Sequence, residues 1–95
     1  MKTILINGEK MTSKKNAFLH LKNKLDQASF YGNNLDALWD VLSSINEPMN
    51  IVLFNKNFLD EYLGEYGNSI IEVFQEAANN KDNIKFRIVN IRLVY

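Results

Sequence analysis

The sequence predicts one α/β domain over residues 1–95, with a three-stranded parallel sheet packed with three to four helices. The chain of 95 residues has the size of a single compact domain. Its periodic segments follow the order strand, helix, strand, helix, strand, which favours parallel strands joined by helices. The middle strand, Asn50 to Asn55, is an almost continuous apolar run, as expected for a strand covered on both faces.

The first strand and the first helix are predicted from local signals. Lys2 to Asn7 is short and rich in β-branched residues, and Gly8 completes a turn signal, so we expect a strand that ends in a tight turn. Thr12 or Ser13 can cap a helix that ends near Asp26. The apolar residues of this helix recur at spacings of three and four, with lysines on the other face: Ala17, Phe18, Leu21 and Leu25.

A loop and a second helix follow. Gln27 to Asn33 contains turn-forming residues and has no sustained period, so we expect a loop that presents Phe30 and Tyr31. Asn34 can cap the second helix. The apolar residues of that helix share one arc: Leu35, Leu38, Val41, Leu42 and Ile45.

Two further helices and the last strand are predicted after the central strand. Asn57 to Leu63 is a short helix that Gly64 to Gly67 interrupts. Asn68 can cap a longer helix that ends at Asn79-Asn80. Asn83 to Val89 alternates apolar and polar residues as a third strand does, and the slip of this phase predicts a bulge or second short segment in residues 91–95. The apolar face of the longer helix is Ile70, Ile71, Phe74, Ala77 and Ala78.

The charges are segregated along the chain although the formal net charge is zero. Between Leu25 and Asn80 there are nine acidic residues and one base, Lys56, whereas both ends of the chain are basic. An acidic segment can steer a basic partner. Folding can also interleave the segments in space, and the sequence leaves both arrangements open.

The second helix carries an acidic face, formed by Asp36, Asp40, Ser43 and Ser44, with Trp39 at its border. The helix dipole favours an anion in the first turn, which explains Asp36 without a partner. Asp40 lies beyond that turn, where a like charge four residues away costs about 0.2 to 0.5 kcal/mol. A basic partner would supply the missing cation.

Other residues are candidates for the same partner. Trp39 can be a core residue or a binding anchor, and Phe30 and Tyr31 share this ambiguity. Glu72 and Glu76 repeat the carboxylate pair at helical spacing, and taken alone they resemble an ordinary solvated surface.

The residues favour a binding protein over an enzyme. His20 is the single histidine, and the chain has no cysteine and no nucleophile motif for it to serve, so a structural role is expected. Asp36 and Asp40 are one helical turn apart, which leaves no cleft between them, and no further oxygen ligands are spaced for a metal. Gly64 to Gly67 lacks the spacing of a phosphate-binding loop. We therefore expect no catalytic residue, metal or cofactor, and no nucleic-acid binding by a chain with an acidic middle.

Composition also bears on the compartment. The chain has no cysteine, which fits a reducing compartment such as the cytoplasm. Its first apolar run is three residues long, too short for a signal peptide, and no stretch approaches the roughly 20 apolar residues of a membrane span. We expect a cytoplasmic protein that is monomeric when free and does not bind membranes.

The segment from Phe30 to Asp40, FYGNNLDALWD, resembles the barstar family of intracellular ribonuclease inhibitors. The resemblance continues at Ile6 to Glu9 and at Val73 to Ala77, and it extends to about Val89. It implies a three-stranded parallel sheet packed with helices. It also implies that the second helix and the loop before it plug the active-site cleft of a basic ribonuclease, with an aspartate of that helix in the place of a substrate phosphate.

The resemblance assigns roles to individual residues. Asp40 matches the aspartate that replaces the phosphate, and Glu76 matches a distal acidic contact. The family pattern is changed at three positions: Phe30 replaces a tyrosine, Ile45 a second tryptophan and Asn80 a glutamate. We therefore expect the same mode of binding toward a different nuclease, or use of this helix as an interaction or regulatory surface for another basic protein. The expected partner-binding residues are Phe30, Tyr31, Asn34, Asp36, Trp39, Asp40, Ser43 and Glu76.

Overall fold

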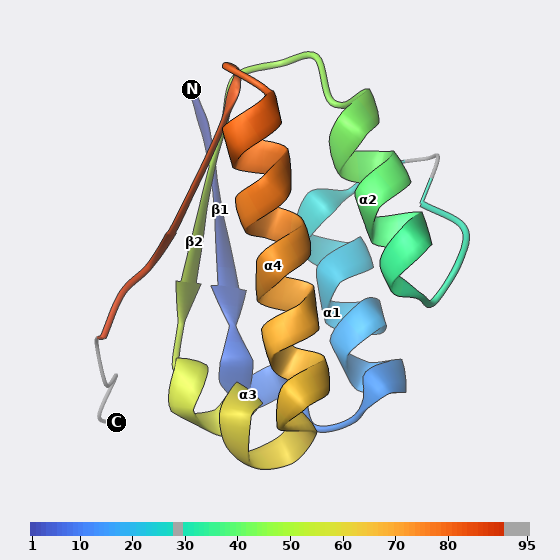
Figure 1. The fold of residues 1–95 in the computed structure, drawn as a ribbon, viewed down its shortest axis with the longest axis vertical. Helices are drawn as coiled ribbons and strands as arrows, with labels where there is room; N and C mark the ends of the chain where they lie inside the picture. Colours follow the sequence, from blue (N-terminus) through green and yellow to red (C-terminus); the bar gives the residue numbers. More distant parts are fainter. Residues whose placement is uncertain (28–29, 91–95) are drawn as a thin grey trace.

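A computed structural model describes residues 1–27 and 30–90 and contains the predicted three-stranded parallel sheet (Figure 1). The strands stand in the order β1, β2, β3, with β2 paired in parallel to both neighbours. The prediction of an α/β domain with a parallel sheet and helices is confirmed. The elements are β1 (Lys2–Asn7), the 3-10 helix η1 (Gly8–Lys10), α1 (Lys14–Leu25), α2 (Leu35–Ser44), β2 (Met49–Phe54), α3 (Lys56–Leu63), α4 (Glu65–Asn80) and β3 (Ile84–Ile88).

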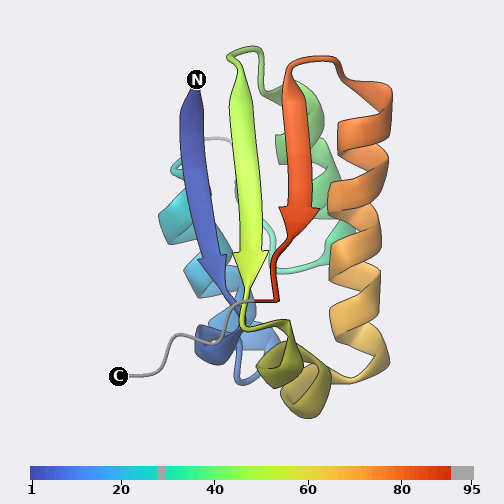
Figure 2. The same cartoon turned by 90° about the vertical axis from the view of Figure 1, so that its left-hand side faces the viewer.

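The helices α1, α2 and α4 lie on one side of the sheet (Figures 1 and 2). Residues of alternating position in the strands point toward these helices, and Ile4, Ile6 and Ile51 are buried there. Helix α4 contacts both β3 and α2, and α1 contacts β1. The ring of Phe74 on α4 stacks on that of Phe86 on β3, with 5.1 Å between centroids. Packing against α4 therefore holds α2 on the helical side of the domain.

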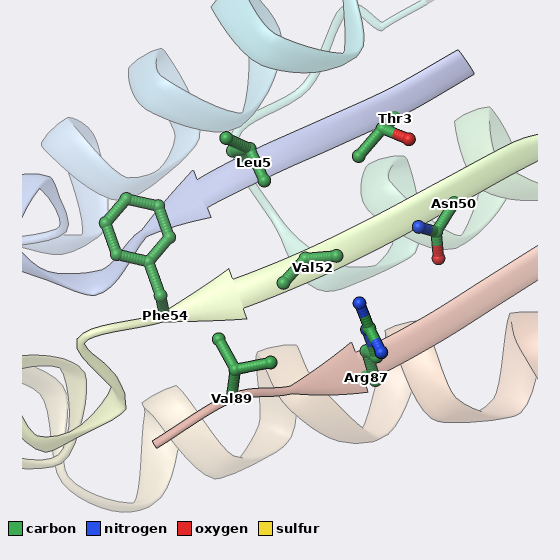
Figure 3. A pocket seen from close by; sticks show the side chains of 7 residues that line it. All are labelled: Thr3, Leu5, Asn50, Val52, Phe54, Arg87 and Val89. Atoms are coloured by element: carbon green, nitrogen blue, oxygen red, sulfur yellow. The ribbon is translucent and has the colours of Figure 1, made fainter. Parts of the chain in front are cut away.

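The opposite face of the sheet differs from the prediction for the central strand. Figure 2 shows no described helix on this face, and Figure 3 shows the side chains that line a shallow hollow there. Val52 is only 6% exposed although no helix covers it, while Leu5 on the edge strand is 53% exposed. The side chains of Leu5 on β1, Arg87 on β3 and Val89 just after β3 lie around Val52 (Figure 3). The apolar run correctly indicated a buried strand, and among the described residues no helix or further strand packs over this face of β2.

Local signals set the helix boundaries. The Ser13 hydroxyl accepts a hydrogen bond from the Asn16 N–H (3.1 Å) at the start of α1, so Ser13 and not Thr12 is the cap. Asp26 adopts a left-handed conformation, with φ of 48°, and ends the same helix. The Asn34 side chain accepts from the Ala37 N–H (2.7 Å) at the start of α2. The predicted starts of both helices are thus confirmed.

The start of α4 was predicted wrongly. The helix begins at Glu65 and not after Asn68, so a single residue, Gly64, separates it from α3. Gly64 has φ of 54° and ψ of −126°, a backbone conformation that residues other than glycine rarely adopt. It reverses the chain between the two helices, and no side chain caps the start of α4. Gly67 is a buried residue of α4 and does not interrupt it. The slip predicted for residues 91–95 lies outside the described residues.

A polar cluster joins β1, α1 and the end of β2. The Asn7 N–H donates to His20 Nε2 (3.0 Å), and the Asn55 side-chain amide donates to Asn7 Oδ1 (3.0 Å). His20 is therefore a neutral hydrogen-bond acceptor that ties α1 to the end of β1. Burial, and to a lesser extent the charges of Lys24 and Lys10, lower the pKa of His20 below its ordinary value. The hydrogen bond from Asn7 to His20 thus accounts for the structural role that we expected for this histidine.

This bond predicts a loss of stability in mild acid. The unfolded chain takes up a proton on His20 near pH 6.5, whereas the folded chain does so only at lower pH. The contribution of His20 is complete above about pH 6.5 and is lost as the pH falls toward the lowered folded-state pKa. Urea unfolding between pH 8 and pH 5 should show the decrease, and His20→Gln, which does not titrate, should remove that part of it. Identical pH profiles for the two proteins would contradict the assignment.

Candidate protein-binding surface

Helix α2 separates its apolar and acidic residues as the sequence predicted. Leu38, Val41 and Leu42 are buried in the core. Asp36, Asp40, Ser43 and Ser44, the residues of the acidic face, are all exposed. Trp39 is half-buried and packs against the core cluster, so part of its surface is available at the border of that face.

The carboxylates of the acidic face have no cationic partner within the described residues. The ion pair that the described residues form joins Lys56 and Asp60 on another helix, α3, with 2.7 Å between Nζ and Oδ2. Asp36 and Asp40 are one turn apart on the same helix and therefore repel each other. The arrangement keeps two solvated negative charges beside an aromatic ring, which suits the capture of a basic group from another molecule.

The loop before α2 presents one aromatic residue and not two. Tyr31 is 85% exposed, as expected, but Phe30 is only 7% exposed. The Phe30 ring meets the ring of Phe18 on α1 edge-to-face, with 6.5 Å between centroids. A ring without a hydroxyl group gains by full burial because it has no polar tip to solvate. The expectation that the loop presents Phe30 was therefore wrong. This residue instead anchors the loop to α1.

Asn34 and Glu76 lie on either side of the acidic face in sequence but have different settings. Asn34 is exposed, and its side-chain oxygen is engaged in capping α2. Glu76 is exposed on α4, the helix that packs beside α2 (Figure 1). Glu72 is exposed one turn earlier on α4. The structure thus adds exposed carboxylates on a neighbouring helix to those of α2.

Two of the positions that depart from the family pattern also have clear settings. Ile45, at the end of α2, is 2% exposed and belongs to the core. Asn80 is exposed at the last position of α4. The residue at position 45 therefore offers no aromatic surface to a partner.

Basic residues from both ends of the chain reach α2, so the charge segments are partly interleaved in space. Lys22 of α1 donates to the loop before α2, and Lys81 donates through Nζ to the backbone carbonyl of Ser43 (2.9 Å). The Asn83 amide donates to the carbonyls of Ile45 (2.9 Å) and Glu47 (3.0 Å). These groups bind carbonyl or amide oxygens and leave the carboxylates free of described ion pairs. The sequence did not predict these contacts, because the acceptor of a surface lysine lies far away in the chain and is known only from the fold.

Neither a metal-binding cluster nor a membrane-spanning helix is present among the described residues. The described part of the chain contains no group of three or more histidine, aspartate or glutamate side chains arranged to hold a metal ion. Among the helices of residues 1–27 and 30–90, none has the length and apolar character needed to cross a membrane.

Comparison with known proteins identifies the family. The model of the family described as "Barstar (barnase inhibitor)" matches residues 1–90. A protein of Bacillus subtilis (strain 168) named "Putative ribonuclease inhibitor YrdF" is 40% identical over 90 residues, which cover 93% of this chain and 99% of the relative. Both matches include the loop, the acidic helix α2 and helix α4. The chain therefore belongs to the Barstar (barnase inhibitor) family.

Proposed function

We propose that this protein is an inhibitor that binds a basic ribonuclease and blocks its active site with α2 and the loop before it. The observation that carries the proposal is the exposure of Asp36 and Asp40 on one helix with no cation paired to them among the described residues. Membership of the barstar family and the name of the relative support the same function. In this proposal the protein has no catalytic residue and acts in the cytoplasm, where its target would otherwise cleave RNA.

The proposed mechanism is occlusion by charge mimicry. The Asp40 carboxylate takes the place of a substrate phosphate among arginine and lysine side chains, where charge-assisted hydrogen bonds are about twice as strong as neutral ones. Asp36 extends the negative charge by one turn, and Glu76 adds a contact from α4. Tyr31 and Trp39 supply aromatic surface that excludes water around these pairs. Ser43 and Asn34 complete the rim, and Phe30 contributes by supporting the loop.

Inhibition of RNA cleavage tests the proposal directly. Barnase, the ribonuclease named in the family description, is the first probe. Titration with this protein should abolish cleavage at a stoichiometry close to one to one, and other small basic ribonucleases should then be ranked by the same assay. Full cleavage by every such enzyme at a large excess of the protein would favour the alternative, in which α2 binds a basic partner that is not a nuclease.

The acidic face predicts a salt-dependent association rate. Complementary charge steers encounter, and exposed charges are screened at a Debye length of about 8 Å at 0.15 M salt. Raising the salt concentration from 50 to 500 mM should slow association with an inhibited ribonuclease by at least about tenfold and change dissociation far less. Stopped-flow mixing measures both rates. An association rate that does not vary with salt would remove steering from the mechanism.

A further inference from the structure

Lys22 makes three contacts with the segment that leads from α1 into α2. Its ammonium group donates to the Asn33 side-chain oxygen (2.7 Å) and to the Tyr31 carbonyl (3.3 Å). The same group lies 5.4 Å from the centroid of the Phe30 ring, within the range of a cation–π contact. Lys22 is in the last turn of α1 and is half-buried, so its position is fixed by a packed helix.

These contacts fall on the residues that determine how the loop meets a partner. Tyr31 extends into solvent, so the direction of its ring depends on how its own backbone is held. Asn33 directly precedes Asn34, the residue that caps α2. The Phe30 ring packs edge-to-face against Phe18 of α1 and so anchors the same segment to that helix. One ammonium group therefore links α1 to the exposed aromatic residue and to the start of the acidic helix.

The charge of Lys22 has the wrong sign for attracting a basic partner. A lysine bound to the loop before α2 lowers the negative potential of this region and so opposes association with a cation. Its acceptors are a carbonyl and an amide, and a charged donor strengthens both hydrogen bonds. A contribution of Lys22 to binding must therefore come from ordering the loop, because a segment ordered in advance loses less entropy in the complex.

We propose that Lys22 is a positioning residue that holds residues 30–33 in the partner-binding geometry before the partner arrives. The proposal rests on the proposed inhibitory function. It predicts opposite effects of this residue on the two rates of binding: removal of its charge favours association, whereas loss of the ordered loop speeds dissociation. The second effect is the larger one, because it acts on contacts formed across the whole loop.

Two lysines in the last turn of α1 allow a matched comparison. Lys24 is exposed and makes no hydrogen bond within the described residues, so Lys24→Gln removes the same charge without releasing the loop. At pH 8, Lys22→Gln should dissociate from barnase about tenfold faster than Lys24→Gln, while both associate slightly faster than the wild type. Lys22→Arg keeps the charge and the donors and should restore most of the slow dissociation. Equal dissociation rates for Lys22→Gln and Lys24→Gln would overturn the proposal.

Amide hydrogen exchange of the free protein gives a readout that does not depend on any nuclease. Lys22→Gln should exchange faster than Lys24→Gln in residues 30–34, with the protection of α1 and β1 unchanged. Unchanged exchange in that segment would refute the ordering role even if barnase binding were altered. If the wild-type protein does not bind barnase, the inhibitory function fails on that probe, and the exchange comparison still decides whether Lys22 holds the loop.

Discussion

Replacement of Asp40 by alanine should weaken binding to an inhibited ribonuclease by about 2 to 5 kcal/mol, a rise in Kd of roughly 30-fold to several-thousand-fold. The Asp40 side chain is exposed, lies beyond the first turn of α2 and has no described ion pair, so removing it should leave the fold intact. The loss arises because the cations of the partner are then desolvated without a counter-charge. Barnase and barstar are among the complexes from which such magnitudes were measured, so the magnitude is not independent of this family.

Matched variants separate the local effect of Asp40 from a general loss of negative charge. Glu61→Ala removes one exposed carboxylate from α3, and its effect on the association rate should be small. Asp36→Ala also removes a charge but adds the loss of a helix-start anion, so it should lower both the affinity and, by about 0.3 to 1 kcal/mol, the free energy of unfolding. Isothermal titration and urea unfolding give the two quantities for each variant. Equal Kd values for Asp40→Ala and Glu61→Ala would remove Asp40 from the mechanism.

Local signals in the sequence were sufficient for most of the fold. The caps at Ser13 and Asn34 and the amphipathic arc of α2 depend on residues within one or two turns, so the sequence contains all that determines them. The cover of β2 depends on which side chains of the neighbouring strands meet over Val52, and periodicity within one strand carries no information about that. The start of α4 was missed because a glycine can end one helix and begin the next without a polar cap.

The proposed binding surface shows the same difference between local and tertiary features. Asp40 could be proposed as a binding residue from the sequence alone, because a like charge one turn away is unfavourable within the helix itself. The burial of Phe30 could not, since it depends on the position of Phe18 on α1. The contacts of Lys22 and Lys81 likewise require the packed arrangement of α1, α2 and the end of α4. Repulsion between neighbouring charges on one helix could thus be predicted from the sequence, whereas contacts between different helices could not.

The second large effect is expected at Gly8, which lies in the segment Ile6 to Glu9 that resembles the family. A Cβ atom built on Gly8 would collide with the carbonyl oxygen of Asn55 and lie 2.9 Å from its carbonyl carbon. That carbonyl cannot readily move, because it accepts the Phe58 N–H (3.1 Å) at the start of α3 and the Asn55 side chain donates to Asn7. Gly8 is therefore required by the close approach of the chain after β1 to the chain after β2.

Gly8→Ala should consequently destabilise the protein by about 3 kcal/mol or more, out of the roughly 5 to 15 kcal/mol expected for a domain of this kind. Thermal unfolding should show a fall in Tm of about 12 to 24 °C for a loss of about 3 kcal/mol. Lys10→Ala, an exposed substitution in the same 3-10 helix, should stay within about 0.5 kcal/mol of the wild type. The folded fraction of Gly8→Ala should still bind an inhibited ribonuclease with the wild-type Kd if the motif around Gly8 serves the fold alone. A stable Gly8→Ala protein with weakened binding would instead assign this segment to the partner-binding surface.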